Sequence, residues 1–94
     1  MKKLVKVEEV EGEGLIGLMG ETVMLLCLNY IYAGKLVGVN DSFVQLENAH
    51  IVYETGPFTD KYYKDAQKLN SEVFYVQTSA IEAFGKGKDL KWLT

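Results

Sequence analysis

The chain has 94 residues, 48% of them hydrophobic and 24% charged, which predicts one folded globular domain rather than a disordered chain. Its net charge is −3 and arginine is absent, which argues against tight, general binding to nucleic-acid backbones but leaves binding through base stacking open. The longest stretch without charge, residues 22–34, is shorter than the roughly 18 apolar residues of a membrane span. Residues 1–12 lack a signal peptide's apolar core and the single cysteine suits a reducing compartment, so we expect a soluble, cytoplasmic protein.

Residues 1–19 have no clear secondary-structure pattern. Residues 4–10, LVKVEEV, alternate only in part between apolar and polar residues, so both a strand and a helical turn fit. Residues 12–17 spell GxGxxG, the dinucleotide-binding fingerprint, which needs its glycines between a strand and a helix. No βαβ unit fits here, because a strand is predicted to follow, and we interpret the glycines as a flexible turn.

Three strands are predicted in the next part of the chain. Residues 22–28, TVMLLCL, form a short apolar run that suits a buried strand. Residues 30–39 and 42–53 follow, with a turn at Asn40-Asp41 between them. Gly34 and Gly38 within the second of these strands indicate a sharp bend or a bulge, as a small curled barrel requires.

A short helix is predicted over residues 57–71. Gly56-Pro57 ends the preceding strand, and four residues then recur at helical spacing: Phe58, Tyr62, Ala66 and Leu69. Asp60 would lie in the first turn and pair with Lys64. The mixture of aromatic and basic residues here can suit nucleic acid, but it is also typical of an amphipathic helix with a solvated lysine face.

Two further short strands are predicted over residues 73–78 and 80–84, joined almost without a loop, and residues 85–94 form a tail. The prediction is therefore a single, mainly β domain. We expect a small, strongly bent, five-stranded antiparallel barrel with the short helix inserted between the third and fourth strands.

Few residues could carry catalysis or bind a metal ion. Cys27 alternates with Leu25 along an apolar run and is predicted to be a buried small side chain rather than a nucleophile. His50, the only histidine, is predicted to be a half-exposed strand residue with no second strong ligand nearby. The carboxylates are scattered singly. We therefore expect no enzyme, no metal site and no cofactor.

Phe43 is the aromatic residue that the pattern explains least well as core. It follows the Asn40-Asp41 turn directly, and it alternates with polar residues, whereas Val44 and Leu46 supply the apolar face. A stacking platform for a nucleobase would use this placement. Lys86 and Lys88, which alternate with glycines, could contact phosphates or could only keep the tail soluble.

Three motifs extend over roughly residues 20–84. They are Val23-x-Leu25-x-x-Leu28-x(5)-Gly34-x-Leu36, then Asp41-Ser42-Phe43-Val44-x-Leu46 with Asn48-Ala49, and finally Val76-Gln77-Thr78-Ser79-Ala80-Ile81. Together they resemble the Sm/LSm family, and within it the Hfq type. The resemblance implies a bent five-stranded barrel that assembles into a closed ring, the fourth strand of one subunit pairing with the fifth strand of the next.

The resemblance also implies single-stranded RNA binding around the pore of the ring. Asp41 would brace the turn, Ser42 and Phe43 would contact and stack on bases, and Asn40 is an added neighbour. Thr78 and Ser79 stand where Hfq has Lys-His and Sm proteins have Arg-Gly, so the basic pore groups are missing. The expected function is that of a homo-oligomeric ring that binds single-stranded RNA or DNA weakly, with a role in RNA or DNA processing or chaperoning.

A second hypothesis belongs to another class of protein. The ring would be a structural or protein-interaction module that never meets nucleic acid, with the helix at 57–71 or the apolar Trp92-Leu93 as its docking surface. The absence of arginine and of basic pore groups motivates it. Both hypotheses use strands 73–78 and 80–84 as ring edges, because neither carries the proline or lysine that blunts an exposed edge.

Overall fold

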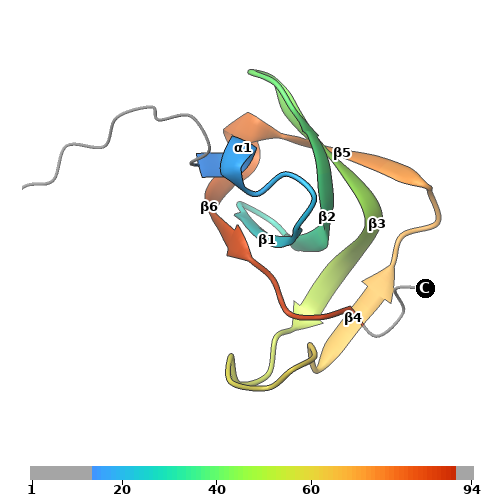
Figure 1. Cartoon of the computed structure of the whole chain (residues 1–94). Coiled ribbons are helices and arrows are strands. Elements are labelled where there is room, and N and C mark those ends of the chain that lie inside the picture. The colour runs from blue at the N-terminus through green and yellow to red at the C-terminus, as the bar shows by residue number, and fades with distance from the viewer. Residues whose placement is uncertain (1–13, 91–94) are drawn as a thin grey trace, which may run out of the picture.

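The computed structural model describes residues 14–90, which form one antiparallel sheet with two short helical segments (Figure 1). In chain order the elements are α1 (Gly14–Gly17), β1 (Thr22–Cys27), β2 (Ile31–Val39), β3 (Phe43–Glu54), β4 (Asp65–Lys68), β5 (Val73–Gln77), η1 (Thr78–Ala80) and β6 (Ile81–Lys86). The predicted mainly β fold is confirmed, and every predicted strand lies within two residues of an observed one. No helix in the described part of the chain is long and apolar enough to cross a membrane.

The six strands follow the order β4-β3-β2-β1-β6, and β5 also pairs with β3. Strand β3 is long and pairs with two strands along the same edge: its first half pairs with β5 and its second half pairs with β4. Within residues 14–90 no ladder joins β5 to β6, so the sheet is open between these two strands. The predicted closed barrel is therefore not confirmed.

The pairing between β2 and β3 is irregular at Gly34. The register between the two strands shifts here by one extra residue on β3, and Asn48 in the bulge has a positive φ of 52°. A side chain on Gly34 would bring its Cβ within 3.0 Å of the Glu47 carbonyl oxygen and 3.2 Å of the Ala49 Cα. A second shift lies between Leu36 and Gly38, so the predicted bending at both glycines is confirmed.

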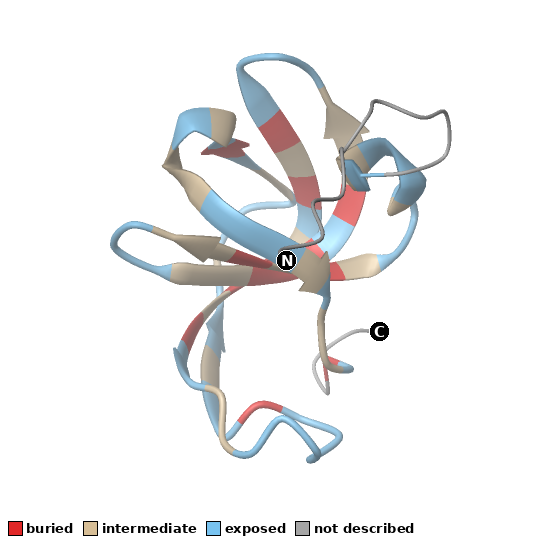
Figure 2. Cartoon of the chain, turned by 90° about the vertical axis from the view of Figure 1, so that its left-hand side faces the viewer, coloured by how far each residue is buried: buried red, intermediate tan, exposed pale blue. Residues whose placement is uncertain are grey.

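Buried side chains lie on both faces of this sheet. The larger core consists of Val23, Leu25, Leu36, Val44, Leu46, Ala49 and Val76. The smaller core consists of Ala33, Val52, Tyr63 and Leu90, and it takes Met24 from the opposite face of β1. The smaller core thus uses residues from the 55–64 loop and from the segment after β6, and Tyr63 is the buried residue in that otherwise largely exposed loop (Figure 2).

The predicted helix over residues 57–71 is wrong. Residues 55–64 form a loop, and Asp65–Lys68 form β4, which pairs with the second half of β3. Phe58 and Tyr62, two of the residues at helical spacing, are 70% and 38% exposed, whereas Tyr63 is buried. Lys64 pairs with Glu54 of β3 at 3.4 Å instead of with Asp60. A helix this short has little stability of its own. Pairing with β3 satisfies the backbone hydrogen-bonding groups at the edge of β3, so residues 65–68 form a strand despite their helical spacing.

Helix α1 occupies the end of the GxGxxG pattern, where a flexible turn was predicted. It is a single turn, and Leu15 within it and Leu18 just after it pack against the larger core. The segment therefore covers apolar side chains rather than leaving a glycine loop free. Gly12 and residues 4–10 lie outside the described residues, as do Trp92-Leu93.

Candidate nucleic-acid interface

The turn between β2 and β3 is closed by the side chain of Asn40. Its Oδ1 accepts hydrogen bonds from the backbone N–H groups of Ser42, at 2.7 Å, and of Phe43, at 2.9 Å. The backbone N–H of Asn40 donates in turn to the carbonyl oxygen of Phe43 at 3.0 Å. This is the local hydrogen bonding that makes asparagine favourable in turns. Asn40, rather than Asp41, therefore braces the turn.

The short helix η1 is tied to this turn by Thr78. The hydroxyl of Thr78 donates to the carbonyl oxygen of Asp41 at 2.8 Å, and its backbone N–H donates to the carbonyl oxygen of Ser42 at 3.0 Å. Ser79, the next residue of η1, is exposed. The structure thus brings together the six residues predicted for nucleic-acid binding: Asn40, Asp41, Ser42, Phe43, Thr78 and Ser79.

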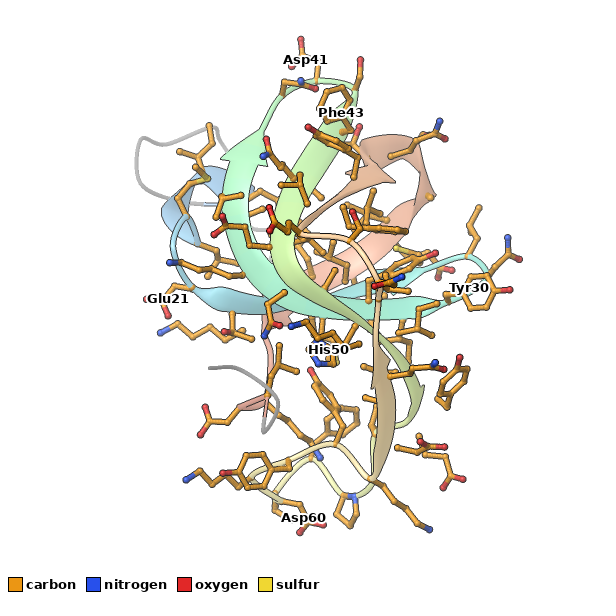
Figure 3. All side chains as sticks on the ribbon, turned by 90° about the vertical axis from the view of Figure 1, so that its right-hand side faces the viewer. Glu21, Tyr30, Asp41, Phe43, His50 and Asp60 are labelled. Atoms are coloured by element: carbon orange, nitrogen blue, oxygen red, sulfur yellow. The ribbon has the colours of Figure 1, made fainter. Side chains whose placement is uncertain are left out.

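Phe43 lies on the outward face at the start of β3. Its side chain is 38% exposed, although its neighbour Val44 is completely buried. The ring meets that of Tyr75 in an edge-to-face contact, with the centroids 5.0 Å apart and the planes at 80°. Tyr75 is itself 56% exposed. Figure 3 places Phe43 and Asp41 at one end of the molecule, opposite the end that holds Asp60.

Tyr75 is a residue that the sequence pattern could have revealed. It alternates on β5 with Val76, which is buried, so its side chain must point to the outer face. Across the β3–β5 ladder, Gln45 lies directly opposite Tyr75, and Phe43 lies directly opposite Gln77. We call these four residues, Phe43, Gln45, Tyr75 and Gln77, the outer block. It contains two aromatic rings and two amides and no charge.

The two predicted phosphate contacts, Lys86 and Lys88, lie away from this end, because both line a pocket together with Asp60. The ammonium of Lys88 donates to the backbone carbonyl oxygens of Thr55 at 2.6 Å, of Pro57 at 2.7 Å and of Tyr62 at 3.3 Å. It also lies 5.5 Å from the ring centroid of Tyr63. Lys88 thus holds the 55–64 loop, and its ammonium donates within the chain; its predicted contact with phosphate stays a prediction.

Lys86 differs from Lys88, because it is exposed on β6 opposite Val23. The 55–64 loop that Lys88 holds includes Asp60, which Figure 3 places at the end opposite Asp41 and Phe43.

Among residues 14–90, no group of three or more histidine, cysteine, aspartate or glutamate side chains is placed to hold a metal ion.

His50 is buried rather than half-exposed, so its predicted exposure is wrong. The side chain is completely inaccessible on β3, and Nδ1 lies 2.7 Å from the carbonyl oxygen of Asn48, which suits a neutral ring donating from Nδ1. Burial lowers the pKa of His50 below its ordinary value, against a smaller opposite effect of the Asn48 hydrogen bond, and Lys68 lowers it further. After the bulge at Asn48, His50 lies on the face of Ala33 and Val52, which the smaller core covers with Tyr63 and Leu90; that second buried face is not evident from the strand pattern alone.

Cys27 packs against the larger core from the end of β1, but it is only partly buried, whereas a buried side chain was predicted. Burial raises the pKa of its thiol, and the charge of Glu82 raises it further. A raised pKa lowers the fraction of reactive thiolate, so Cys27 lacks the environment of a nucleophile.

The chain matches no protein-family model, and no significant relative is found among curated proteins. The likeness to the Sm/LSm family therefore rests on the motifs described above, and any function drawn from it has to be argued from the geometry of the residues themselves.

Proposed function

We propose that this protein forms a homo-oligomeric ring and binds single-stranded nucleic acid, RNA in the first instance, at the end that holds Phe43. A role in RNA or DNA processing or chaperoning would follow. The observation that carries the proposal is Phe43, a large aromatic side chain kept 38% exposed between a braced turn and a completely buried valine. Exposed aromatic rings on a sheet are the platforms on which single-stranded nucleic acids stack their bases.

The free edge of β5 supports assembly into a ring. The backbone N–H of Thr78 donates to the Ser42 carbonyl oxygen, and in an antiparallel ladder every second residue makes such backbone hydrogen bonds to the neighbouring strand. By this alternation, the backbone groups of Val73, Tyr75 and Gln77 point away from β3. The hydroxyl of Ser71 donates to the Val73 carbonyl oxygen at 2.7 Å, in keeping with that orientation. The outward groups of Tyr75 and Gln77 are available to a neighbouring strand.

Strand β6 offers the complementary edge. Gly87 donates to the Thr22 carbonyl oxygen at 2.9 Å, so by alternation the backbone groups of Phe84 and Lys86 face away from β1. The Phe84 side chain shares a face with the buried Leu25 directly opposite it, yet it is 43% exposed. Pairing of β5 in one copy with β6 in the next would cover this apolar side chain, and such head-to-tail contacts close into rings when the rotation allows.

The order of the elements adds support from the Sm-like resemblance. Three strands precede the insertion, two follow it, and the last two are joined only by η1. The insertion itself is a loop and a short strand, which removes the helix that the rival protein-interaction hypothesis used as a docking surface.

Fluorescence anisotropy of short labelled U-rich RNA, A-rich RNA and single-stranded DNA, at two salt concentrations, tests the proposal. We expect base-dependent binding with a shallow salt dependence, because the residues around Phe43 carry few cations. Phe43→Ala should weaken binding by about 1–3 kcal/mol for each stacked base. The matched control is Phe58→Ala, which removes a more exposed ring in the loop at the opposite end and should leave affinity unchanged.

Two outcomes would contradict the proposal. Absence of binding at high protein concentration and low salt would remove nucleic acid as the ligand and favour the protein-interaction hypothesis. Binding that Phe43→Ala and Phe58→Ala weaken equally would remove the Phe43 end as the site.

A further inference from the structure

The four residues of the outer block form two cross-strand pairs with closely spaced side chains. The Ser42–Thr78 pair is hydrogen-bonded, so the next pair along the ladder, Phe43–Gln77, is a non-hydrogen-bonded pair. The same alternation makes Gln45–Tyr75 a non-hydrogen-bonded pair. Side chains approach each other most closely at such positions, and each aromatic ring therefore has an amide directly across from it and the other ring on the diagonal.

The two rings support each other without covering each other. The 80° angle and the 5.0 Å separation put the edge of one ring against the face of the other, and substantial surface of both stays in solvent. Both side chains stand on a paired sheet rather than on a loop, which restricts their motion before any ligand arrives. Stacking of a base on these two rings would therefore cost the protein less conformational entropy than stacking on rings of a loop.

The two glutamines supply hydrogen-bonding groups that can face a base edge. Each amide presents a carbonyl oxygen acceptor and two N–H donors. The Gln45 amide lies beside Gly38, since Oε1 is 3.2 Å from where a Cβ on Gly38 would be, and the glycine therefore leaves room for it. Single-stranded nucleic acids are read through hydrogen bonds to base edges and through stacking, and neither interaction needs a cation.

From these features we infer that the outer block reads the base: Phe43 and Tyr75 hold a single-stranded base by stacking, and the Gln45 and Gln77 amides select its edge. This inference rests on the proposed function and specifies how the site discriminates between bases. The phosphates would stay in solvent, because none of the four side chains carries a charge.

Variants of the two kinds of residue separate stacking from base reading. Tyr75→Ala removes a sequence-tolerant platform and should weaken binding to oligo-U and oligo-A by a similar factor, about 5- to 150-fold. Gln77→Glu and Gln45→Glu keep the shape but replace the N–H donors with an acceptor. At least one of them should change the ratio of oligo-U to oligo-A affinity by about tenfold, since a good amide–base pair discriminates by that order.

Strand β3 offers a matched control in its second half. Tyr53 is 55% exposed there, and its hydroxyl donates to the Gln67 Oε1 at 3.2 Å, which makes a second exposed pair of tyrosine and glutamine on the same sheet. Tyr53→Ala and Gln67→Glu should change neither affinity nor base ratio. Far-UV circular dichroism and light scattering establish that each variant keeps its fold and its assembly.

The outcomes distinguish the inference from the proposed function. If wild-type protein binds oligonucleotides while Tyr75→Ala and both glutamine variants keep its affinity and base ratio, the proposed function stands and the inference is wrong. If Tyr75→Ala instead changes the molecular mass of the assembly, the outer block is a subunit contact, and the inference is again wrong. If wild-type protein binds neither oligonucleotide, the proposed function fails and the inference fails with it.

Discussion

The hydroxyl of Thr78 donates a hydrogen bond to the carbonyl oxygen of Asp41 at 2.8 Å, although 37 positions separate the two residues. With the neighbouring bond from the Thr78 N–H to the Ser42 carbonyl, it fixes η1 against the β2–β3 turn. The two parts of the candidate interface, the β2–β3 turn and η1, are thus held together by Thr78, which was itself predicted to contact nucleic acid.

Removal of the Thr78 hydroxyl should therefore weaken the attachment of η1 to the β2–β3 turn. We expect Thr78→Val to lower the free energy of unfolding by about 1 kcal/mol, because the valine keeps the shape but leaves the Asp41 carbonyl without its donor. Thr78→Ser keeps the donor and should stay close to wild type. Urea unfolding of the three proteins measures both values, and equal stabilities would mean that the bond contributes nothing.

Gly34 tests the bend between β2 and β3. Gly34→Ala would press a Cβ against the Glu47 carbonyl oxygen at 3.0 Å and the Ala49 Cα at 3.2 Å, and backbone atoms of a buried bulge cannot move aside freely. We expect a loss of about 1–3 kcal/mol in the free energy of unfolding. Gly85→Ala on β6, where a Cβ meets no atom within 4 Å, is the control and should be neutral or slightly stabilising. Similar losses in both variants would contradict this account.

Much of the fold could be predicted because β-strands leave a period-two pattern with turn residues at their ends. The strands on either side of the Asn40 turn, and the bends at Gly34 and Gly38, were found in this way. The 57–71 segment could not be predicted, because its periodicity is a local property whereas its structure depends on the unpaired edge of β3. The burial of His50 was missed for a related reason, since the face on which it lies after the bulge at Asn48 is covered by Tyr63 and Leu90 from segments distant in the sequence.

The candidate interface could be predicted where one turn carries it. The residues from Asn40 to Phe43 are contiguous, and their proximity needs no tertiary information. Alternation with Val76 could have placed Tyr75 on the outer face, but its contact with Phe43 depends on the β3–β5 register, which the sequence leaves open. The structural role of Lys88 could not be predicted, because the three carbonyl oxygens that accept from it converge only when the 55–64 loop folds against the segment after β6.

The role of Lys88 leads to a prediction about stability rather than binding. Lys88→Met should lower the free energy of unfolding by about 1.5–3 kcal/mol, since it deletes charge-assisted hydrogen bonds to carbonyl oxygens of the 55–64 loop. Lys86→Met, at an exposed position, should stay within about 0.5 kcal/mol of wild type. Chemical unfolding measures both, and the salt dependence of nucleic-acid binding should be the same for Lys88→Met as for wild type. A lower salt slope in Lys88→Met would identify Lys88 as a phosphate contact.

His50 should make the stability of the fold depend on pH. Burial holds its pKa in the folded state below the ordinary value of 6.5, so the unfolded chain binds more protons as the pH falls through that value. The free energy of unfolding should therefore decrease as the pH falls below about 6.5, down to the lowered pKa of the folded state. His50→Asn retains an N–H donor but does not titrate, and its stability should fall less between pH 7 and pH 5.5, with the carboxylates contributing equally to both proteins. Parallel pH profiles would contradict the assignment.

The free edge of β6 yields a prediction about assembly. Proline at position 84 removes a backbone N–H that points away from β1, so it should block pairing with a neighbouring copy without breaking a hydrogen bond of the native ladder. We expect the wild-type protein to have the mass of a closed oligomer in light scattering, and Phe84→Pro to have the mass of one chain with an unchanged far-UV spectrum.

Phe84→Ala separates the backbone from the side chain at this position. It keeps the outward N–H but removes the apolar ring that is 43% exposed in the single chain, so it should weaken assembly less than proline does. Equal dissociation in both variants would mean that the ring of Phe84, and not strand pairing, holds the copies together. A wild-type protein with the mass of one chain at micromolar concentration would contradict the proposed ring, because both free edges would then remain unpaired in solution.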